Sequence, residues 1–391
     1  MRSVPSQLSG FVIRHKRFVL ALTMVVFVLI ALVTSTPFIL PLGIFVSLYI
    51  GTSQNEHTGA TFIRRFTIFG ALFLIVLASF NYIVNPLGIY PPHWFEPLIW
   101  ASRNQKMNLF AAYNPPPQAL VLGSSRSFTI APTQIEALWG YRTFNASLTA
   151  SSVRDYLAYT RFALESGANL KLIIVNISVE TFREFDVHSA EPDASLWDYL
   201  ENNPLSGLAT RFDQITRLVS AQQTDASLQL LNAERNGRGQ PHYYFDDEGQ
   251  GHFYEALSLD VAVDTYIKNG WGTAFQLSSY DLADSLGVFE QFLDLCRREN
   301  IRVIGYMPPY HPKLLQYITS NGDYIALETQ ILHELDRVKE LDQFDYVNFV
   351  HSYPLTDLEA TFYDAVHPKP EAAANMMQAL HDAFPLTEAQ S

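Results

Sequence analysis

Residues 119–126 read Ala-Leu-Val-Leu-Gly-Ser-Ser-Arg, and this stretch indicates how the C-terminal part of the chain folds. Its four apolar residues are typical of a short strand that is buried on both faces of a sheet. The run stops at Gly123, and the small residues that follow favour a tight turn with a hydroxyl at its tip. The sequence therefore predicts a buried strand whose carboxyl end presents Ser125.

Strand-like and helix-like segments alternate from this strand to the end of the chain. Further strands are predicted at 142–145, 170–177, 301–307 and 346–350, and helices at 132–139, 151–166, 286–298 and 372–384. Such alternation favours right-handed crossovers and a parallel sheet with helices on both faces. Residues 183–285 interrupt it and are rich in Asp, Gln, Asn and Tyr. They are predicted to be an insertion, a partly helical cap over the site.

The N-terminal head of the chain differs in composition from the rest. Residues 1–85 hold six of the 26 Lys and Arg residues but only one of the 39 acidic residues, Glu56, although the whole chain carries a net charge of −13. A basic, apolar head on an acidic body is typical of a membrane anchor that carries a soluble domain. The acidic body argues against a nucleic-acid partner, because phosphate binding needs clustered Lys and Arg. The single cysteine, Cys296, excludes an intrachain disulfide and a multi-cysteine metal site, and no metal or other cofactor is expected.

Three apolar runs in this head predict about three transmembrane helices, at 18–33, 37–50 and 66–84. Basic residues precede the first and the third run, and the positive-inside rule places both clusters in the cytoplasm. The chain is then a multi-pass protein of the cytoplasmic (inner) membrane with its C-terminal domain outside. The alternative is a buried core hairpin in a soluble protein. Residues 86–117, which contain several prolines, are predicted to be a linker to the domain at 118–391, or else an irregular lid packed on that domain.

A second motif near the C-terminal end supplies the partners that a serine nucleophile needs. Asp364 and His367 stand three residues apart in Asp-Ala-Val-His-Pro, after the predicted strand at 346–350. An imidazole can take the proton of a serine hydroxyl, and a carboxylate can orient the imidazole. Because ligands bind at the carboxyl ends of strands in open α/β sheets, Ser125, Asp364 and His367 are predicted to meet as a catalytic triad.

These motifs resemble those of the SGNH (GDSL-like) hydrolase superfamily, through short blocks in about 118–182 and 300–384. The family's Gly-Asp-Ser block reads Gly-Ser-Ser here, so Ser125 matches the nucleophile, and its Asp-x-x-His-Pro block is matched fully at 364–368. The Gly-Ser-Ser variant also looks like that of membrane-anchored envelope relatives such as the D-alanyl-lipoteichoic acid protein DltD. The resemblance implies an α/β fold of three layers with a flavodoxin-like parallel sheet, and ester chemistry on acyl groups.

The resemblance also implies an oxyanion hole, in which the backbone N–H groups of Ser125 and Ala150 hold the negative oxygen. Ala150 stands at the position of a family glycine, in Asn-Ala-Ser-Leu-Thr-Ala at 145–150. An alanine offers the same N–H provided that the position needs no positive φ. The third family block, Gly-x-Asn-Asp, is replaced by Ser-Val-Glu-Thr at 178–181, and the Glu180 carboxylate cannot donate a hydrogen bond.

Four further polar residues follow predicted strands at the same sheet edge and are candidate substrate-binding residues: Arg126, Asn145, Glu180 and His311. Arg126 could receive an anionic or sugar-linked substrate, but a surface salt bridge is the favoured interpretation. His311 lies in a Pro-Pro-Tyr-His-Pro turn, where a plain turn histidine is the simpler interpretation.

The sequence thus favours a membrane-anchored serine esterase or acyltransferase of the SGNH type. Its substrates would be ester-linked acyl groups, acetyl among them, on an extracytoplasmic glycan or lipid, and the envelope polysaccharide machinery is its expected partner. Hydrolase and transferase are not separable by sequence. Two alternatives stay open. One is a degenerate SGNH-like domain that binds glycan or scaffolds an envelope export complex, and the other is a lipase with a hydrophobic anchor.

Overall fold

The computed structural model describes residues 59–86, 88, 90, 94–95, 102–183, 195–200, 212, 215–236, 243–253, 257–269, 274–342 and 344–385. The chain divides into two compact units. One comprises Met1–Trp100 and Arg211–Arg238, and the other comprises Ala101–Thr210 and Gly239–Ser391. The predicted membrane spans at 18–33 and 37–50 lie outside the described residues.

The second unit is built around a parallel sheet of five strands in the order β2-β1-β3-β6-β7. The strands are β1 (Ala119–Leu122), β2 (Thr143–Asn145), β3 (Leu172–Asn176), β6 (Arg302–Met307) and β7 (Asp345–Asn348). Each lies within, or one residue from, a segment that the sequence predicts as a strand. The predicted parallel sheet is confirmed, and its order is flavodoxin-like, with the winding reversed between β1 and β3.

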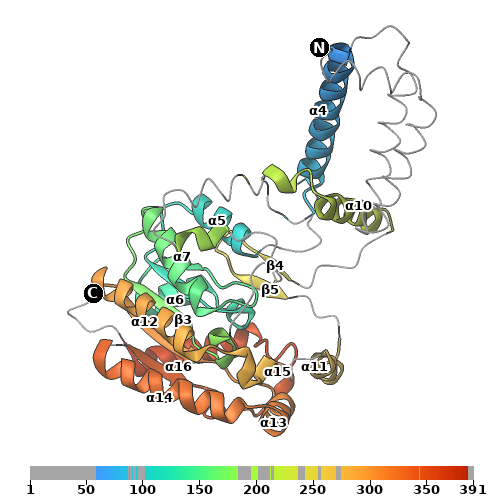
Figure 1. Cartoon of the computed structure of the whole chain (residues 1–391). Helices are drawn as coiled ribbons and strands as arrows, with labels where there is room; N and C mark the ends of the chain where they lie inside the picture. The colour runs from blue at the N-terminus through green and yellow to red at the C-terminus, as the bar shows by residue number, and fades with distance from the viewer. Residues whose placement is uncertain are drawn as a thin grey trace. The chain divides into compact units, whose positions relative to one another are not determined.

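Helices cover both faces of this sheet (Figure 1), because alternate residues of each strand point to opposite faces. On one face, side chains of β1, β3 and β6 pack against α6 (Pro132–Trp139) and α16 (Pro370–Ala383). On the other face, the alternate side chains of the same strands pack with α7 (Val153–Glu165), α12 (Leu282–Arg298) and α14 (Tyr324–Asp342). This arrangement gives the three layers that the apolar runs predict.

The region predicted as an insertion, 183–285, holds several short elements. Within the sheet unit these are η3 (Ser195–Tyr199), a hairpin of β4 (Tyr243–Phe245) and β5 (Gly251–Phe253), α11 (Leu259–Lys268) and η5 (Leu277–Ser279). The hairpin docks on the edge strand β2, where the Asn145 N–H donates to the Glu248 carbonyl at 2.9 Å. Helix α10 (Ala221–Asn236) of the same region belongs to the first unit.

Helix α5 (Ser102–Ala112) lies inside the stretch predicted as a linker, 86–117, and packs into the sheet unit. The helix fits between the proline-rich ends of that stretch. The Arg103 guanidinium donates to both Asp155 carboxylate oxygens at 2.8 and 2.7 Å, and both side chains are fully buried. The Lys106 ammonium is also buried and donates to the Asn145 carbonyl at 2.6 Å. The chain therefore enters the sheet unit before residue 118.

The helices described in the first unit are α4 (Gly59–Val84) and α10, and α10 crosses one end of α4 (Figure 1). A buried polar network joins them. Asn81 Nδ2 donates to Thr224 Oγ1 at 2.9 Å, and Ser227 Oγ donates to Asn81 Oδ1 at 2.8 Å. The third predicted span, 66–84, falls in α4. Within the described residues, no helix combines the length and the apolar character that crossing a membrane requires.

Two short helices near the site complete the sheet unit. Helix α13 (Pro312–Asn321) follows β6, and α15 (Leu358–Thr361) precedes the Asp-x-x-His motif. Neither of these two helices is predicted from the sequence, and α14 is not predicted either. The turn between β1 and α6 contains a single 3-10 turn, η1 (Ser125–Ser127), and a second, η2 (Val179–Phe182), follows β3.

Candidate active site

The nucleophile turn follows β1 directly and requires a glycine. A Cβ at Gly123 would lie 2.8 Å from Ser127 Cβ and 2.9 Å from Asn176 Cβ, which is closer than non-bonded carbon atoms approach each other. Without a side chain at this position the backbone passes between them and enters η1. Ser125, the first residue of η1, is partly exposed at the carboxyl end of β1, while the residues around it are buried.

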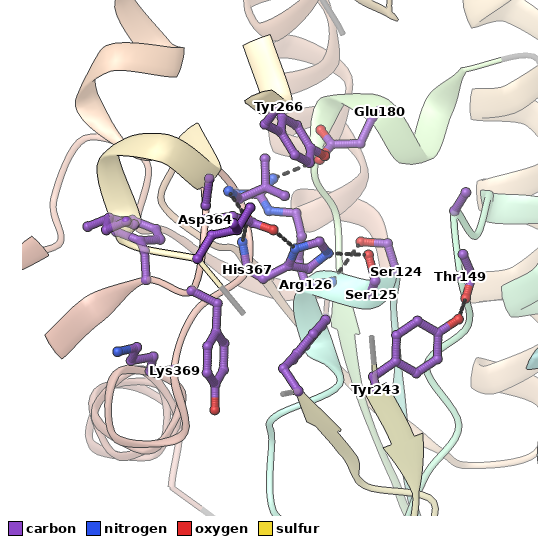
Figure 2. Close-up of a pocket in the computed structure, with 18 of the residues that line it drawn as sticks. Ser124, Ser125, Arg126, Thr149, Glu180, Tyr243, Tyr266, Asp364, His367 and Lys369 are labelled. Carbon is purple, nitrogen blue, oxygen red and sulfur yellow. Dashed lines mark hydrogen bonds and ion pairs between the residues drawn. The ribbon is translucent and has the colours of Figure 1, made fainter. Parts of the chain in front are cut away.

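The three predicted triad residues form one hydrogen-bonded chain (Figure 2). Ser125 Oγ lies 2.8 Å from His367 Nε2, across 242 positions of sequence, and His367 Nδ1 lies 2.7 Å from Asp364 Oδ2. The other carboxylate oxygen of Asp364 accepts the N–H groups of Val366 and His367 at 2.8 and 2.9 Å. The carboxylate is therefore fixed by its own loop, and it fixes the imidazole in turn.

The environment of Asp364 keeps its carboxyl group ionised. Burial alone would raise the pKa of Asp364, but the nearby charge of His367 and the hydrogen bonds from the His367 ring and from two backbone N–H groups lower it to about 2. An ionised Asp364 favours the imidazole tautomer with its proton on Nδ1. Nε2 is then left to accept the proton of Ser125, as a general base must.

Ala150, the second predicted oxyanion residue, lines the same pocket as Ser125 but has an unusual backbone conformation. Its φ is +46°, in the left-handed region where a Cβ costs about 1–2 kcal/mol. This position therefore has a positive φ, and the condition for a strain-free alanine is not met. Ala150 thus lines the pocket in a strained backbone conformation.

Arg126 and Glu180 form a buried ion pair beside the nucleophile, so the expectation of a surface salt bridge is wrong about its location. Arg126 is 3% exposed, and its Nη1 donates to Glu180 Oε1 at 2.8 Å. Nη2 donates to the carbonyl groups of Pro308 and Pro309 at 2.7 and 2.8 Å, and the guanidinium carbon lies 3.9 Å from the centroid of the Tyr310 ring. Both side chains border the pocket, but their charges are paired with each other.

Asn145 and His311, the other two candidate substrate-binding residues, do not line this pocket. Asn145 is fully buried, and its amide nitrogen donates to three backbone carbonyls of the turn at 127–130. His311 caps the start of α13, where its Nδ1 accepts the Lys313 N–H at 3.2 Å, and burial lowers the pKa of His311. Asn145 therefore holds the nucleophile turn, and His311 begins a helix.

A cavity of about 570 Å³ opens over the triad, and the insertion supplies part of its wall. Tyr243 and Phe253 come from the hairpin, and Leu259 and Tyr266 come from α11. The centroid of the Phe253 ring lies 4.8 Å from that of the His367 ring. The His367 imidazole is thus packed against an aromatic side chain that comes from the insertion.

The sequence did not predict a hydroxyl pair on the other side of the nucleophile. Thr149 Oγ1 lies 2.8 Å from Tyr243 Oη, on the side of Ser125 away from His367 (Figure 2). Tyr-Tyr-Phe and Gly-His-Phe on either side of a turn at 246–250 could have signalled a hairpin. Nothing in that pattern says which part of the sheet the hairpin packs on.

No cluster of His, Cys, Asp or Glu side chains that could hold a metal ion occurs in the described ranges of the chain. His252 Nε2 lies 2.8 Å from Asp246 Oδ2, and Asp246 Oδ1 accepts the N–H groups of Glu248 and Gln250. These contacts organise the hairpin turn. Cys296 is buried in α12, and burial raises the pKa of its thiol.

Comparison with known proteins gives a likeness in fold. No family model matches the sequence, and no curated protein matches it. Solved structures similar to this chain include one from Bacteroides fragilis NCTC 9343 that is described as a "putative acylhydrolase". It has 11% identity, a TM-score of 0.33, and coverage of 73% of this chain and 98% of that one. A GDSL-like lipase from Bacteroides thetaiotaomicron VPI-5482 has 12% identity, a TM-score of 0.35, and coverage of 73% and 99%.

A third similar structure is a protein from Streptococcus pneumoniae whose description names platelet activating factor, with 10% identity, a TM-score of 0.36, and coverage of 80% of this chain and 98% of that one. The likeness of this chain to the three structures is one of fold, and one of them is described as a GDSL-like lipase. TM-scores this low carry no argument about its chemistry. That argument rests on the side chains of the site.

Proposed function

We propose that this protein is a serine-dependent acyl-transfer enzyme, an esterase or acyltransferase of the SGNH type that acts on ester-linked acyl groups. The observation that carries the proposal is the unbroken hydrogen-bond chain from Ser125 through His367 to Asp364, which opens into a cavity of about 570 Å³. A hydroxyl, an imidazole and an ionised carboxylate in this order are the parts that nucleophilic acyl transfer needs.

The geometry suits two half-reactions. His367 Nε2 takes the proton of Ser125 while Ser125 Oγ attacks the ester carbonyl carbon. The carbonyl oxygen becomes negatively charged, and the N–H groups of Ser125 and Ala150 stabilise that charge. His367 then gives its proton to the leaving alkoxide, and the acyl group stays on Ser125. In the second half, His367 deprotonates a water molecule or an acceptor hydroxyl, which attacks the acyl-enzyme and frees Ser125.

A fluorophosphonate probe tests the proposal, because it forms a stable bond only with an activated serine. The full-length chain, solubilised in detergent, should be labelled at Ser125. Ser125→Ala should abolish the labelling, and His367→Ala should slow it by about 10³-fold or more. Ser352→Ala is the control, since this exposed serine lies outside the pocket. Equal labelling of the wild type and Ser125→Ala would sink the proposal.

A second candidate function is a degenerate domain that binds glycan or scaffolds an envelope export complex. Two observations favour it. Glu180 occupies the position of a family oxyanion donor and accepts a hydrogen bond from Arg126, and Ala150 is strained where the family has glycine. Turnover of p-nitrophenyl acetate separates the two functions. Turnover that disappears in His367→Ala removes the binding-only reading.

We further propose that the chain is anchored in the cytoplasmic membrane and acts on an envelope glycan or lipid outside it. The proposal is supported by the basic, apolar composition of residues 1–85 and by large apolar side chains exposed on α4: Ile68, Leu72, Leu74, Ile75 and Val76. A reporter fused after Ser391 checks the topology. Activity of a reporter that works only in the cytoplasm would contradict it.

A further inference from the structure

The proposed reaction leaves one place in the oxyanion hole unfilled. In the third sequence block, Glu180 accepts from Arg126 at 2.8 Å and donates nothing to the pocket. We propose that the hydroxyl of Thr149 is the missing donor and that Tyr243, from the inserted hairpin, fixes the direction of its proton. This inference rests on the proposed acyl transfer at Ser125. It assigns Thr149 a catalytic role and Tyr243 a positioning role.

The backbone places Thr149 beside the nucleophile turn. The Leu148 N–H donates to the Gly123 carbonyl at 2.8 Å, so the loop that carries Thr149 is bonded to the turn that carries Ser125. Thr149 itself precedes Ala150, and both line the pocket. The Thr149 N–H donates to the buried Ser102 Oγ at 2.9 Å and is not available to a substrate. Its hydroxyl is the polar group that Thr149 offers to the pocket.

The proposed role of Thr149 depends on the direction of the hydrogen bond between the two hydroxyls. Either hydroxyl can donate across the 2.8 Å contact between Thr149 Oγ1 and Tyr243 Oη, and we take Tyr243 as the donor because a phenol is more acidic than an aliphatic alcohol. Thr149 Oγ1 makes no other hydrogen bond to a described residue. Its own proton is therefore left for the substrate oxygen, and a hydroxyl that accepts one hydrogen bond donates the next one more strongly.

Tyr243 is held firmly enough to aim this proton. The buried Lys106 ammonium donates to the carbonyls of Asn145 and Gly249 and so joins the hairpin turn to the end of β2. The Tyr243 ring packs against Phe128, with 5.1 Å between centroids, and Phe128 follows η1 directly. A residue of the insertion is thus tied to the nucleophile turn through packing and hydrogen bonds.

Steady-state kinetics of the full-length chain with p-nitrophenyl acetate test the assignment. Thr149→Val keeps the shape of the side chain and removes the hydroxyl, so kcat should fall by about 100-fold, with KM changed little. Thr149→Ser keeps the hydroxyl and should retain most of the activity. Tyr243→Phe should lower kcat by about 10-fold, because the Thr149 proton is then free to turn away. Tyr244→Phe is the matched control, since the neighbouring tyrosine stacks on His252 and does not line the pocket.

The thermal midpoint of each variant separates a lost donor from a damaged fold. A wild-type kcat in Thr149→Val, or a change in KM alone, would overturn the role of Thr149. A loss of activity in Thr149→Ser as large as that in Thr149→Val would overturn it too. If Ser125→Ala turns over the ester as fast as the wild type, the proposed function itself fails. If turnover depends on Ser125 but not on Thr149, only the inference about Thr149 fails.

Discussion

Ala150 holds a left-handed backbone conformation, with φ at +46°, that glycine adopts without strain. The Cβ costs about 1–2 kcal/mol in this conformation. Glycine removes that cost, but it raises the conformational entropy of the unfolded chain, which destabilises the folded state by about 0.5–1 kcal/mol. We therefore expect Ala150→Gly to raise the thermal midpoint of the full-length chain by about 1–3 °C.

Ala146→Gly is the control for this substitution. Ala146 is buried in the same loop and has no positive φ, so glycine there should lower the midpoint. A lower midpoint for Ala150→Gly as well would contradict the prediction, because the strain at Ala150 would then be smaller than the entropic cost of glycine.

The ionised carboxyl of Asp364 links the stability of the site to acid pH. Because the pKa of Asp364 falls to about 2 in the folded chain, its contribution to folding is present above pH 4 and is lost as the pH falls from about 4 to 2. That contribution is about 2 kcal/mol. We expect the midpoint of the wild type to approach that of Asp364→Asn over this range. Asp294→Asn, at an exposed position on α12, should show no such convergence.

At the scale of elements, three strands of the sheet end on the same local device. Asn145, Asn176 and Asn348 are the last residues of β2, β3 and β7, and the side-chain oxygen of each accepts the N–H of the second residue after it, at 3.1, 2.9 and 2.9 Å. Asparagine favours such turns because its side chain substitutes for a backbone acceptor. The chain therefore leaves the sheet sharply at the edge where Ser125 lies.

The strands were predictable because strands of a covered parallel sheet are continuous apolar runs. The meeting of Ser125, Asp364 and His367 was predictable for a related reason, since each residue stands in a loop after a strand. The positive φ of Ala150 depends on the path of its loop, and a sequence pattern does not state it. The contact of Tyr243 with Thr149 depends on where an inserted hairpin docks. Contacts between segments that lie far apart in the sequence leave no periodic pattern of residues from which they could be predicted.

Helices α13 and α14 were missed for a different reason. Both follow β6, and α14 is amphipathic, with Leu327, Ile331, Leu335 and Val338 buried at helical spacing. The same spacing is present in the sequence, but charged residues flank both Leu335 and Val338. Helix α5 was missed because the prolines on either side of it dominated the composition of residues 86–117.

The docking of the hairpin should depend on pH through Lys106. Burial lowers the pKa of Lys106, and the charge of Asp246 offsets part of this. The unfolded chain then binds more protons than the folded chain between the two pKa values, so stability rises as the pH increases towards 10. We expect the midpoint of the wild type to rise relative to that of Lys106→Met between pH 7 and pH 10. Lys313→Met, at an exposed lysine, should lack this trend.

At the scale of the whole molecule, the polypeptide passes between its two units more than once. Residues 1–100 and 211–238 belong to one unit, and residues 101–210 and 239–391 form the sheet unit. The sheet unit is therefore discontinuous in sequence. Composition alone indicated a boundary near 118, and it gave no sign that α10 returns to the N-terminal unit.

This path decides how a soluble fragment has to be cut. Removing residues 1–100 alone deletes Asn81, the partner of Thr224 and Ser227, and leaves the buried face of α10 uncovered. We expect such a fragment to aggregate in size-exclusion chromatography. A fragment that also replaces 211–238 with a short glycine-serine bridge should elute as a single species and keep its fluorophosphonate reactivity. A monodisperse fragment after the first cut alone would contradict this.

The sheet unit is thus encoded by two separate stretches, 101–210 and 239–391, and a fragment without residues 211–238 has to join them.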